Sequence, residues 1–317
     1  MKCYFAPLEG LTDSVYRRLH HRYFSGIDRY YMPFISPTIH RTLTKKEDRE
    51  LPMAQSQPFI AVPQILTKDP DAFLWAAQQC ADRGYDEVNL NIGCPSGTVV
   101  SKGKGAGMLA DPDALDRFLD RIFSGTPLPI SVKTRVGVND EESLPRLVEV
   151  FDRYPMVRLI VHPRIRKDFY NTPVRQEAFR YCYEDLHLPL CYNADLCSKA
   201  DISAIEQRYP KLESVMIGRG LIGDPGMLTP GGSTAKELHQ FHDALLEEYI
   251  VLFGGARNAM FRMKENWHYL SCRFEGCEKL YKQLRKTTDV AEYRAITTQI
   301  FHTLPLRPSA DPQWLHK

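Results

Sequence analysis

Short apolar or β-branched runs alternate with amphipathic stretches along the first ~220 residues of the chain. Eight of these runs have the length and composition of strands: residues 2–6, 29–35, 59–65, 87–92, 130–136, 158–163, 189–194 and 214–219. Several are continuously apolar rather than alternating, which is typical of parallel strands covered by helices. The pattern therefore predicts a largely parallel sheet.

Start and stop signals place helices between these strands. Asp-Pro-Asp occurs at 69–71 and again at 111–113, each time directly before an amphipathic stretch. An aspartate cap followed by proline is a common beginning of a helix. Ser198 opens a third stretch in the same way, and Gly84 follows the first as a terminating glycine.

Eight strand–helix units in about 225 residues predict an α/β fold, a (β/α)₈ TIM barrel, over residues 1–232. A doubly wound dinucleotide-binding sheet fits less well, because no G-x-G-x-x-G follows the first strand. After a Gly-rich linker at 229–234 the pattern is helical only. We expect a small all-helical C-terminal domain over residues 233–317.

The overall charge argues against a polyanion partner for the whole surface. The chain has 317 residues with 41 Lys and Arg against 39 Asp and Glu, a net charge of +2. The surplus is local, because the stretch 257–286 holds eight Lys and Arg against three Glu. If a polyanion binds, we expect it at that stretch.

Composition also sets expectations about location and metals. The N-terminal segment has acidic residues where a signal peptide needs an apolar run, and no stretch offers ~18 consecutive apolar residues. We therefore expect a cytoplasmic protein without a membrane span. The eight cysteines form no C-x-x-C pair and no zinc spacing, so reduced thiols and no metal site are expected.

Polar residues gather at the predicted C-terminal ends of the strands, where active sites of barrels lie. In strand order they are Glu9, Gln64, Asn91, Cys94, Lys133, Arg135, His162, Arg164, Asn193, Asp195 and Arg219. The Gly-Arg-Gly turn at 218–220 suits a phosphate. A cation such as Lys133 favours a reduced flavin, so the set favours flavin mononucleotide (FMN). A small phosphorylated substrate remains the alternative.

Cys94 stands apart from the other cysteines. It follows a strand end, lies between Gly93 and Pro95, and opens a loop that contains Gly97, Gly103, Gly105 and Gly107. A flexible loop of this kind can bring a thiol over a bound ligand. The alternative is an inert buried cysteine, which is the commoner role.

These motifs resemble those of the tRNA-dihydrouridine synthases. The matching stretches are APLEGLTD, NLNIGCPSG followed by GKGAGMLADP, ISVKTRVG, VHPRIRKDFY and SVMIGRG, and the similarity extends over the helical tail. The resemblance implies an enzyme in which FMN, reduced by NADPH, reduces a uridine of tRNA. We expect it to act as a monomer.

The resemblance also implies roles for individual residues. Cys94 would be the general acid. The flavin would be bound by Pro7, Leu8, Glu9, Gln64, Lys133, His162, Asn193, Ala194, Asp195, Gly218 and Arg219. Asn91 and Arg164 would hold the target base, with Lys133 and His162 as further candidates. We further expect tRNA contacts from Arg135, Lys102 and Lys104 of the barrel and, because of the surplus of positive charge in the tail, from Arg257, Arg262, Lys264 and Arg285.

Three departures from the family pattern lie in these motifs. Pro7-Leu8 replaces the more usual Pro-Met, an exchange that conserves volume. His162-Pro-Arg-Ile165 replaces His-Gly-Arg-Thr, and Asn193-Ala194 replaces Asn-Gly. The lost glycines affect how closely the backbone approaches a flavin, and the lost threonine removes a hydroxyl from the substrate side.

The chemistry required fits the residue types. Reduction of the C5–C6 bond of uracil needs a hydride at C6 and a proton at C5. A cysteine thiol with an ordinary pKa near 8.5 is mostly protonated at pH 7 and can donate that proton. Two other functions remain open: a flavin barrel that acts on a free pyrimidine, and a non-catalytic RNA-binding barrel.

Overall fold

The computed structural model describes residues 1–311, which form two compact units. The first comprises residues 1–9, 28–194 and 206–216, and the second comprises residues 10–27, 195–205 and the chain from 217 onward. The units therefore do not follow the order of the chain. The domain boundary expected between residues 232 and 233 stays a prediction.

The first unit is built on a parallel sheet. Its strands are β1 (Lys2–Phe5), β2 (Arg29–Tyr31), β3 (Ala61–Val62), β4 (Gln64–Ile65), β5 (Val88–Ile92), β6 (Ile130–Arg135), β7 (Arg158–His162), β8 (Leu190–Tyr192) and β9 (Ser214–Ile217), the last residue of which belongs to the second unit. They are ordered β3-β2-β1-β9-β8-β7-β6-β5-β4. All eight predicted strands are thus present.

The first and last strands in this order, β3 and β4, follow each other in the chain and are separated only by Pro63. Pro63 separates β3 from β4 within the predicted strand 59–65, because proline has no N–H to donate to a neighbouring strand. β3 pairs with β2, β4 pairs with β5, and a bridge between Ile35 and Ile65 spans the interruption. The strands therefore form a nearly closed barrel, to which Pro63 still contributes because its carbonyl accepts from the Asn89 N–H at 2.8 Å.

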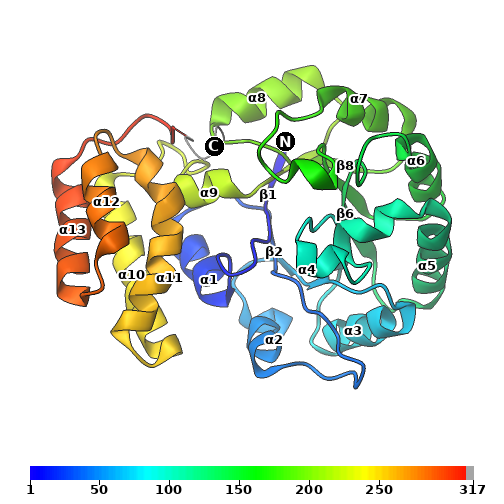
Figure 1. The fold of residues 1–317 in the computed structure, drawn as a ribbon, viewed down its shortest axis with the longest axis horizontal. Coiled ribbons are helices and arrows are strands. Elements are labelled where there is room, and N and C mark those ends of the chain that lie inside the picture. The colour runs from blue at the N-terminus through cyan, green and yellow to red at the C-terminus, as the bar shows by residue number, and fades with distance from the viewer. Residues whose placement is uncertain (312–317) are drawn as a thin grey trace. The chain divides into compact units, whose positions relative to one another are not determined.

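Helices follow most strands of the barrel. They are α2 (Lys45–Glu50), α3 (Pro70–Asp82), α4 (Gly97–Val100), α5 (Pro112–Gly125), α6 (Leu144–Asp152), α7 (Gln176–Asp185) and, across the boundary between the units, α8 (Lys199–Arg208). Figure 1 shows α3, α5, α6 and α7 along the outside of the strands. The alternation of strands and helices confirms the predicted α/β class.

The predicted helix signals are present in atomic detail. Asp69 accepts hydrogen bonds from the backbone of Asp71 and Ala72 at the start of α3. Asp111 accepts one from Ala114 at the start of α5, at 2.9 Å. Gly84, two residues after the end of α3, adopts a φ of +80°, which a glycine tolerates without strain.

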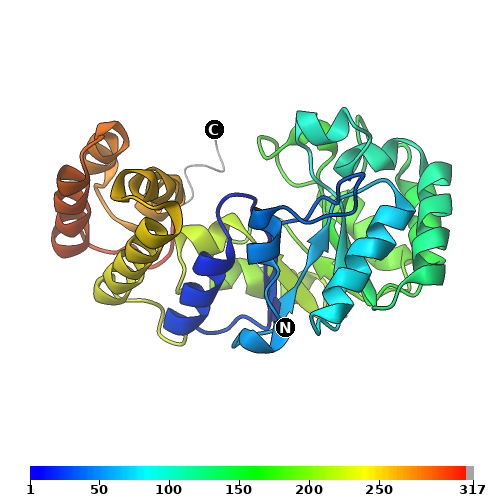
Figure 2. The same ribbon diagram turned by 90° about the horizontal axis from the view of Figure 1, so that it is seen from below.

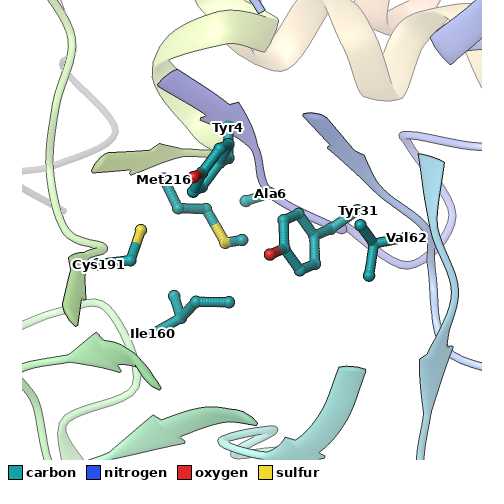
Figure 3. Packing of buried hydrophobic residues seen from close by; sticks show 7 residues of the cluster. All are labelled: Tyr4, Ala6, Tyr31, Val62, Ile160, Cys191 and Met216. Carbon is teal, nitrogen blue, oxygen red and sulfur yellow. The ribbon is translucent and has the colours of Figure 1, made fainter. Parts of the chain in front are cut away.

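The interior of the barrel is filled by a cluster of buried side chains, shown in Figure 3. Its members come from six strands: Tyr4, Ala6, Tyr31, Val62, Ile160, Cys191 and Met216. Val62, Ile160 and Cys191 each lie two residues before a position that was predicted to bind the cofactor. Because strand residues two apart point to the same face, those predicted positions are directed to the same barrel interior, nearer its C-terminal end.

The second unit is helical in the residues described. It contains α1 (Ser14–Tyr23), α9 (Arg219–Gly223), α10 (Ala235–Phe253), α11 (Ala256–Leu270), α12 (Glu278–Lys286) and α13 (Val290–Thr303). Helices α10, α11 and α13 lie side by side in Figures 1 and 2. Trp267 and Phe274 are buried within the unit.

The helices predicted between residues 235 and 303 are therefore confirmed, but they do not stand alone. α1, from the start of the chain, packs against α10, where Tyr16 and Phe24 contact Phe241 with ring centroids 5.5 and 5.1 Å apart. That residues 233–317 form a separate domain stays a proposal.

Candidate active site

Five neighbouring strands each direct a polar residue into the C-terminal end of the barrel. These residues, called the polar ring below, are Gln64, Asn91, Lys133, His162 and Asn193. Four of them are at most 8% exposed, and Lys133 is half-buried. The sequence had predicted all five as site residues, and the barrel brings them to one end.

Hydrogen bonds join the ring members on β4 and β5. Gln64 donates from Nε2 to Asn89 Oδ1 and accepts at Oε1 from Asn91 Nδ2, both at 2.7 Å. Asn91 Oδ1 in turn accepts from the backbone N–H groups of Gly93 and Cys94, at 3.1 and 3.0 Å. Asn91 therefore holds the first residues of the loop that follows β5.

Cys94 is partly exposed, whereas six of the eight cysteines are buried. Its carbonyl accepts a hydrogen bond from Ala106, in the 3₁₀ turn Gly105–Ala110. Gly105 has a φ of +56°, and a Cβ there would lie 2.9 Å from the Cys94 carbonyl oxygen. The loop thus packs tightly against Cys94 and needs glycine at position 105.

Lys133 is an ammonium group without a protein partner. In the part of the chain that the structure describes, no group hydrogen-bonds or ion-pairs with it. Burial, with the nearby Arg135 guanidinium, lowers the pKa of Lys133 to about 8. Holding an uncompensated cation away from water costs free energy, so this position is suited to an anionic ligand.

His162 and Arg164 form a pair after β7. Arg164 is 1% exposed and donates from Nε to the carbonyl of Thr172 at 2.8 Å. One of its terminal nitrogens lies 3.3 Å from His162 Nε2. Because a guanidinium can only donate, Nε2 of His162 must accept, which places the proton of the neutral imidazole on Nδ1.

Arg135 is buried, and its guanidinium hydrogen-bonds to backbone carbonyls. Its guanidinium donates to the carbonyls of Gly93, Ile165 and Phe169, at 3.0, 2.9 and 2.9 Å. It therefore ties the loop after β5 to the loop after β7. The structure gives this predicted tRNA contact an observed role in shaping the site.

The remaining predicted cofactor residues of the first unit vary in exposure. Asn193 is buried and donates to the carbonyl of Met216 at 2.8 Å, while Ala194 is half-buried. Pro7 and Leu8 are half-buried after β1. Glu9 is exposed and forms an ion pair with Lys46. Glu9 is thus the predicted cofactor contact most open to water.

The remaining three predicted cofactor residues belong to the second unit. Arg219 donates to Asp195 at 2.7 Å, and Gly218 precedes the short helix α9. A Cβ at Gly220 would lie 2.0 Å from the carbonyl oxygen of Leu196, so only glycine fits there. The Gly-Arg-Gly turn therefore packs closely on the chain that carries Asp195.

The predicted tRNA contacts of the helices divide into two kinds. Arg257 and Arg285 are exposed. Arg262 donates to the carbonyl of Gly10 and pairs with Glu265. Lys264 donates to the carbonyls of Arg285 and Thr287, and burial lowers its pKa. Arg257 and Arg285 are thus exposed, whereas Arg262 and Lys264 are half-buried and bind protein atoms.

The two predicted lysines of the loop after β5 also differ. Lys102 is exposed, whereas Lys104 donates to Ser36 Oγ at 3.3 Å. Lys104 therefore connects this loop to the chain after β2, and Lys102 is the one that faces water.

Sequence reasoning missed Asn89 and Ser131. Both are fully buried, and Asn89 donates from Nδ2 to Ser131 Oγ at 2.9 Å. Each lies two residues before a predicted site residue, Asn91 and Lys133, and so on the same face of its strand. Polar residues at that spacing within apolar strands were the available signal.

Residues 1–311 offer neither a membrane span nor a cluster of metal ligands. No helix among them is both long and apolar enough to cross a membrane. No group of three or more His, Cys, Asp or Glu side chains in that range is arranged to hold a metal ion.

Residues 4–304 match the family model "Dihydrouridine synthase (Dus)". The chain is 27% identical to tRNA-dihydrouridine synthase B of Pasteurella multocida, with 71% of this chain and 67% of the relative covered. It is 27% identical to probable tRNA-dihydrouridine synthase 1 of Synechocystis sp., covering 95% and 86%. A probable tRNA-dihydrouridine synthase of Staphylococcus aureus is 28% identical, covering 92% and 90%.

The barrel also resembles solved structures of low sequence identity. A morphinone reductase mutant in complex with tetrahydroNAD matches with a TM-score of 0.51 and 9% identity, over 71% of this chain and 85% of that one. At this identity the likeness shows the fold alone.

Proposed function

Because this chain belongs to the dihydrouridine synthase family, a family of oxidoreductases, we propose that it reduces the C5–C6 double bond of a uridine in tRNA to 5,6-dihydrouridine. FMN would be the cofactor and NADPH the reductant. The observation that carries this proposal is the match to the family model over residues 4–304, nearly the whole chain.

The polar ring fits the isoalloxazine of FMN. Lys133 is an unpartnered cation in a half-buried position, which suits the negative charge of a reduced flavin ring. Gln64, His162 and Asn193 surround the same end of the barrel, with Pro7, Leu8, Glu9 and Ala194 at its strand ends. Asp195, Gly218 and Arg219 remain cofactor residues by prediction from the sequence.

When bound and reduced, FMN supplies the hydride that adds to C6 of uracil. Cys94 would supply the proton that C5 needs. Its backbone is held on both sides, by Asn91 at the N–H and by Ala106 at the carbonyl, so the backbone that carries the thiol has a defined position. Because Cys94 is partly exposed, the thiolate left after donation can take a new proton from water.

The substrate side of the site would be shaped by two buried arginines. Arg135 and Arg164 donate to loop carbonyls after β5 and β7, so we propose that they support the loops that receive the base. Asn91 has one N–H left for the base, since its other N–H donates to Gln64 and its oxygen accepts from the loop backbone. Extruding a stacked base costs a few kcal/mol, so contacts elsewhere on the tRNA must offset that cost.

Those contacts would come from exposed cations. Arg257 and Arg285 on the helices and Lys102 on the barrel face water and can meet phosphates. The head groups of Arg262, Lys264 and Lys104 already donate to protein atoms. These three residues would therefore add positive charge near the tRNA without being free to turn toward a phosphate. A cytoplasmic location and a monomeric state stay predictions from the sequence.

Purified protein tested against three substrates decides between the functions. With NADPH and an unmodified tRNA transcript, we expect a yellow protein that adds two hydrogens to a uridine, detected by nucleoside mass spectrometry. Turnover of free uracil or dihydroorotate instead would show a pyrimidine enzyme. A colourless protein that binds tRNA without modifying it would show a non-catalytic RNA-binding barrel.

A further inference from the structure

Four buried polar side chains form one continuous chain of hydrogen bonds across β4, β5 and β6, called the amide relay below. Asn89 donates to Ser131 Oγ at 2.9 Å and accepts from Gln64 at 2.7 Å. Gln64 accepts from Asn91 at 2.7 Å, and Asn91 accepts from the backbone of Cys94 at 3.0 Å. The relay thus runs from the barrel interior to the loop that carries the predicted acid.

The direction of the relay follows from its outer end. The backbone N–H groups of Gly93 and Cys94 can only donate, so they must face Asn91 Oδ1. Asn91 then presents Nδ2 to Gln64, which must accept at Oε1 and present Nε2 to Asn89. The positions of the nitrogen and the oxygen in each side-chain amide of the relay therefore follow from its hydrogen bonds.

Because the side chains of the relay are buried, losing one of its hydrogen bonds costs free energy. Asn89 and Ser131 are 0% exposed, Gln64 is 1% exposed and Asn91 is 8% exposed. Water cannot replace a lost partner at such positions without entering the barrel. Removing one member leaves its neighbour with an unpaired donor or acceptor.

We propose that Asn89 is a positioning residue that holds Gln64 against the cofactor and, through Gln64 and Asn91, fixes Cys94. This inference rests on the proposed function, in which Gln64 faces the flavin. With one N–H and one lone pair already used within the relay, Gln64 offers one N–H and one lone pair in a defined direction. Such a pair matches the alternating donors and acceptors of a pyrimidine edge. Ser131 completes the relay behind Asn89.

Three variants separate positioning from simple stability. Asn89→Leu keeps the volume but removes the acceptor for Gln64. Asn89→Asp keeps an acceptor for Gln64, and the Ser131 hydroxyl can rotate to donate to its second oxygen. Thr134→Val is the matched control. Like Asn89→Leu, it replaces a buried polar side chain by an apolar one of similar size, since Thr134 is 1% exposed. The Thr134 hydroxyl donates to the neighbouring Arg135 carbonyl at 2.8 Å and is not part of the relay.

The first measurement needs no cofactor. Cys94 and Cys272 are the two cysteines that are not buried, so a Cys272→Ser background leaves Cys94 as the accessible thiol. We expect Asn89→Leu to speed the reaction of Cys94 with N-ethylmaleimide by about fivefold or more, as the loss of one buried hydrogen bond implies. Asn89→Asp is expected to restore the slow rate. Equal rates in Asn89→Leu and Thr134→Val would overturn the proposal.

The second measurement follows FMN. Fluorescence quenching by the flavin-free protein should show a Kd about tenfold higher in Asn89→Leu and within about twofold of wild type in Thr134→Val. Unchanged affinity in Asn89→Leu would refute the link to Gln64. If wild type itself binds no FMN, the proposed function fails, while the maleimide rates still decide whether the relay positions Cys94. If Asn89→Leu does not fold, Ser131→Ala replaces it, and rates equal to Thr134→Val again overturn the proposal.

Discussion

Substitution of Gly105 by alanine perturbs the loop that carries Cys94 in two ways at once. The residue has a φ of +56°, a conformation that alanine adopts at a cost of roughly 1–2 kcal/mol. The added Cβ would also lie 2.9 Å from Val99 Cγ1 and from the Cys94 carbonyl oxygen. The contact with the carbonyl oxygen cannot be relieved by turning a side chain, so the backbone at position 105 or at Cys94 must move.

Two other glycines of the same loop separate these effects. A Cβ added at Gly97 would meet no atom within 4 Å, and the φ there is not left-handed, so Gly97→Ala should be neutral or stabilising by up to ~1 kcal/mol. Gly103 has a φ of +68° and only the flexible end of Lys68 nearby, at 3.4 Å. Gly103→Ala should therefore cost roughly 1–2 kcal/mol. Gly105→Ala adds overpacking of ~1–3 kcal/mol, for a total of roughly 2–5 kcal/mol.

Urea denaturation of the three variants measures these costs, and dihydrouridine formation measures their effect on Cys94. We expect the free energy of unfolding to fall in the order Gly97→Ala, Gly103→Ala, Gly105→Ala. Product formation should fall at least about tenfold in Gly105→Ala, since an error of ~1.4 kcal/mol in placing Cys94, the proposed acid, is enough for that loss. FMN content should stay at the wild-type level, because the loop change leaves Lys133 in place.

The reasoning would be refuted if Gly105→Ala were no less stable than Gly103→Ala. That result would mean that the contact with the Cys94 carbonyl is relieved without cost. Loss of stability in Gly97→Ala would equally contradict it, since that position has open space and an ordinary backbone.

Three further predictions follow from the site. Cys94→Ala should retain FMN and oxidise NADPH but form dihydrouridine at least ~100-fold more slowly, measured by nucleoside mass spectrometry, and full product formation would remove the thiol from the mechanism. Lys133→Met should weaken FMN binding yet raise the melting temperature of the flavin-free protein at pH 7. The lowered pKa means that the charged lysine costs stability below about pH 8, and that this cost fades as the pH rises toward 10.5, so the melting temperatures should converge there. Charge reversal of Arg257 and Arg285 should weaken tRNA binding and leave the FMN content unchanged. The slope of the logarithm of the binding constant against the logarithm of the salt concentration should become shallower by up to ~0.9 per lost phosphate contact. Unaltered affinity would count against tRNA binding at these helices.

The elements of the barrel could be predicted from the sequence because their signals are local. Apolar runs such as 88–92 and 130–135 form strands wherever helices cover them, and the caps at Asp69 and Asp111 satisfy N–H groups only three residues away or fewer. The polar residues at the strand ends were predictable for the same reason. Parallel strands bring all their C-terminal ends to one side of the barrel.

Partners that are distant in sequence were not predictable in this way. The relay joins Gln64 to Asn89 across 25 positions and Asn89 to Ser131 across 42, and its existence depends on the register between neighbouring strands. The same holds for Arg135, which the sequence presents as a free cation and the structure commits to three carbonyls up to 42 residues away.

The sequence by itself determined the barrel, the helices that follow it and the residue types that gather at one end, since each of these depends on patterns within a few turns or strands. Only the tertiary structure decided which of those polar groups are already satisfied by the protein and which remain open to a ligand. Within the described residues, Lys133 is left without a partner while its neighbour Arg135 has three. That difference arises because hydrogen bonds in a closed barrel are set by register and loop geometry, which bring together atoms that the chain holds far apart.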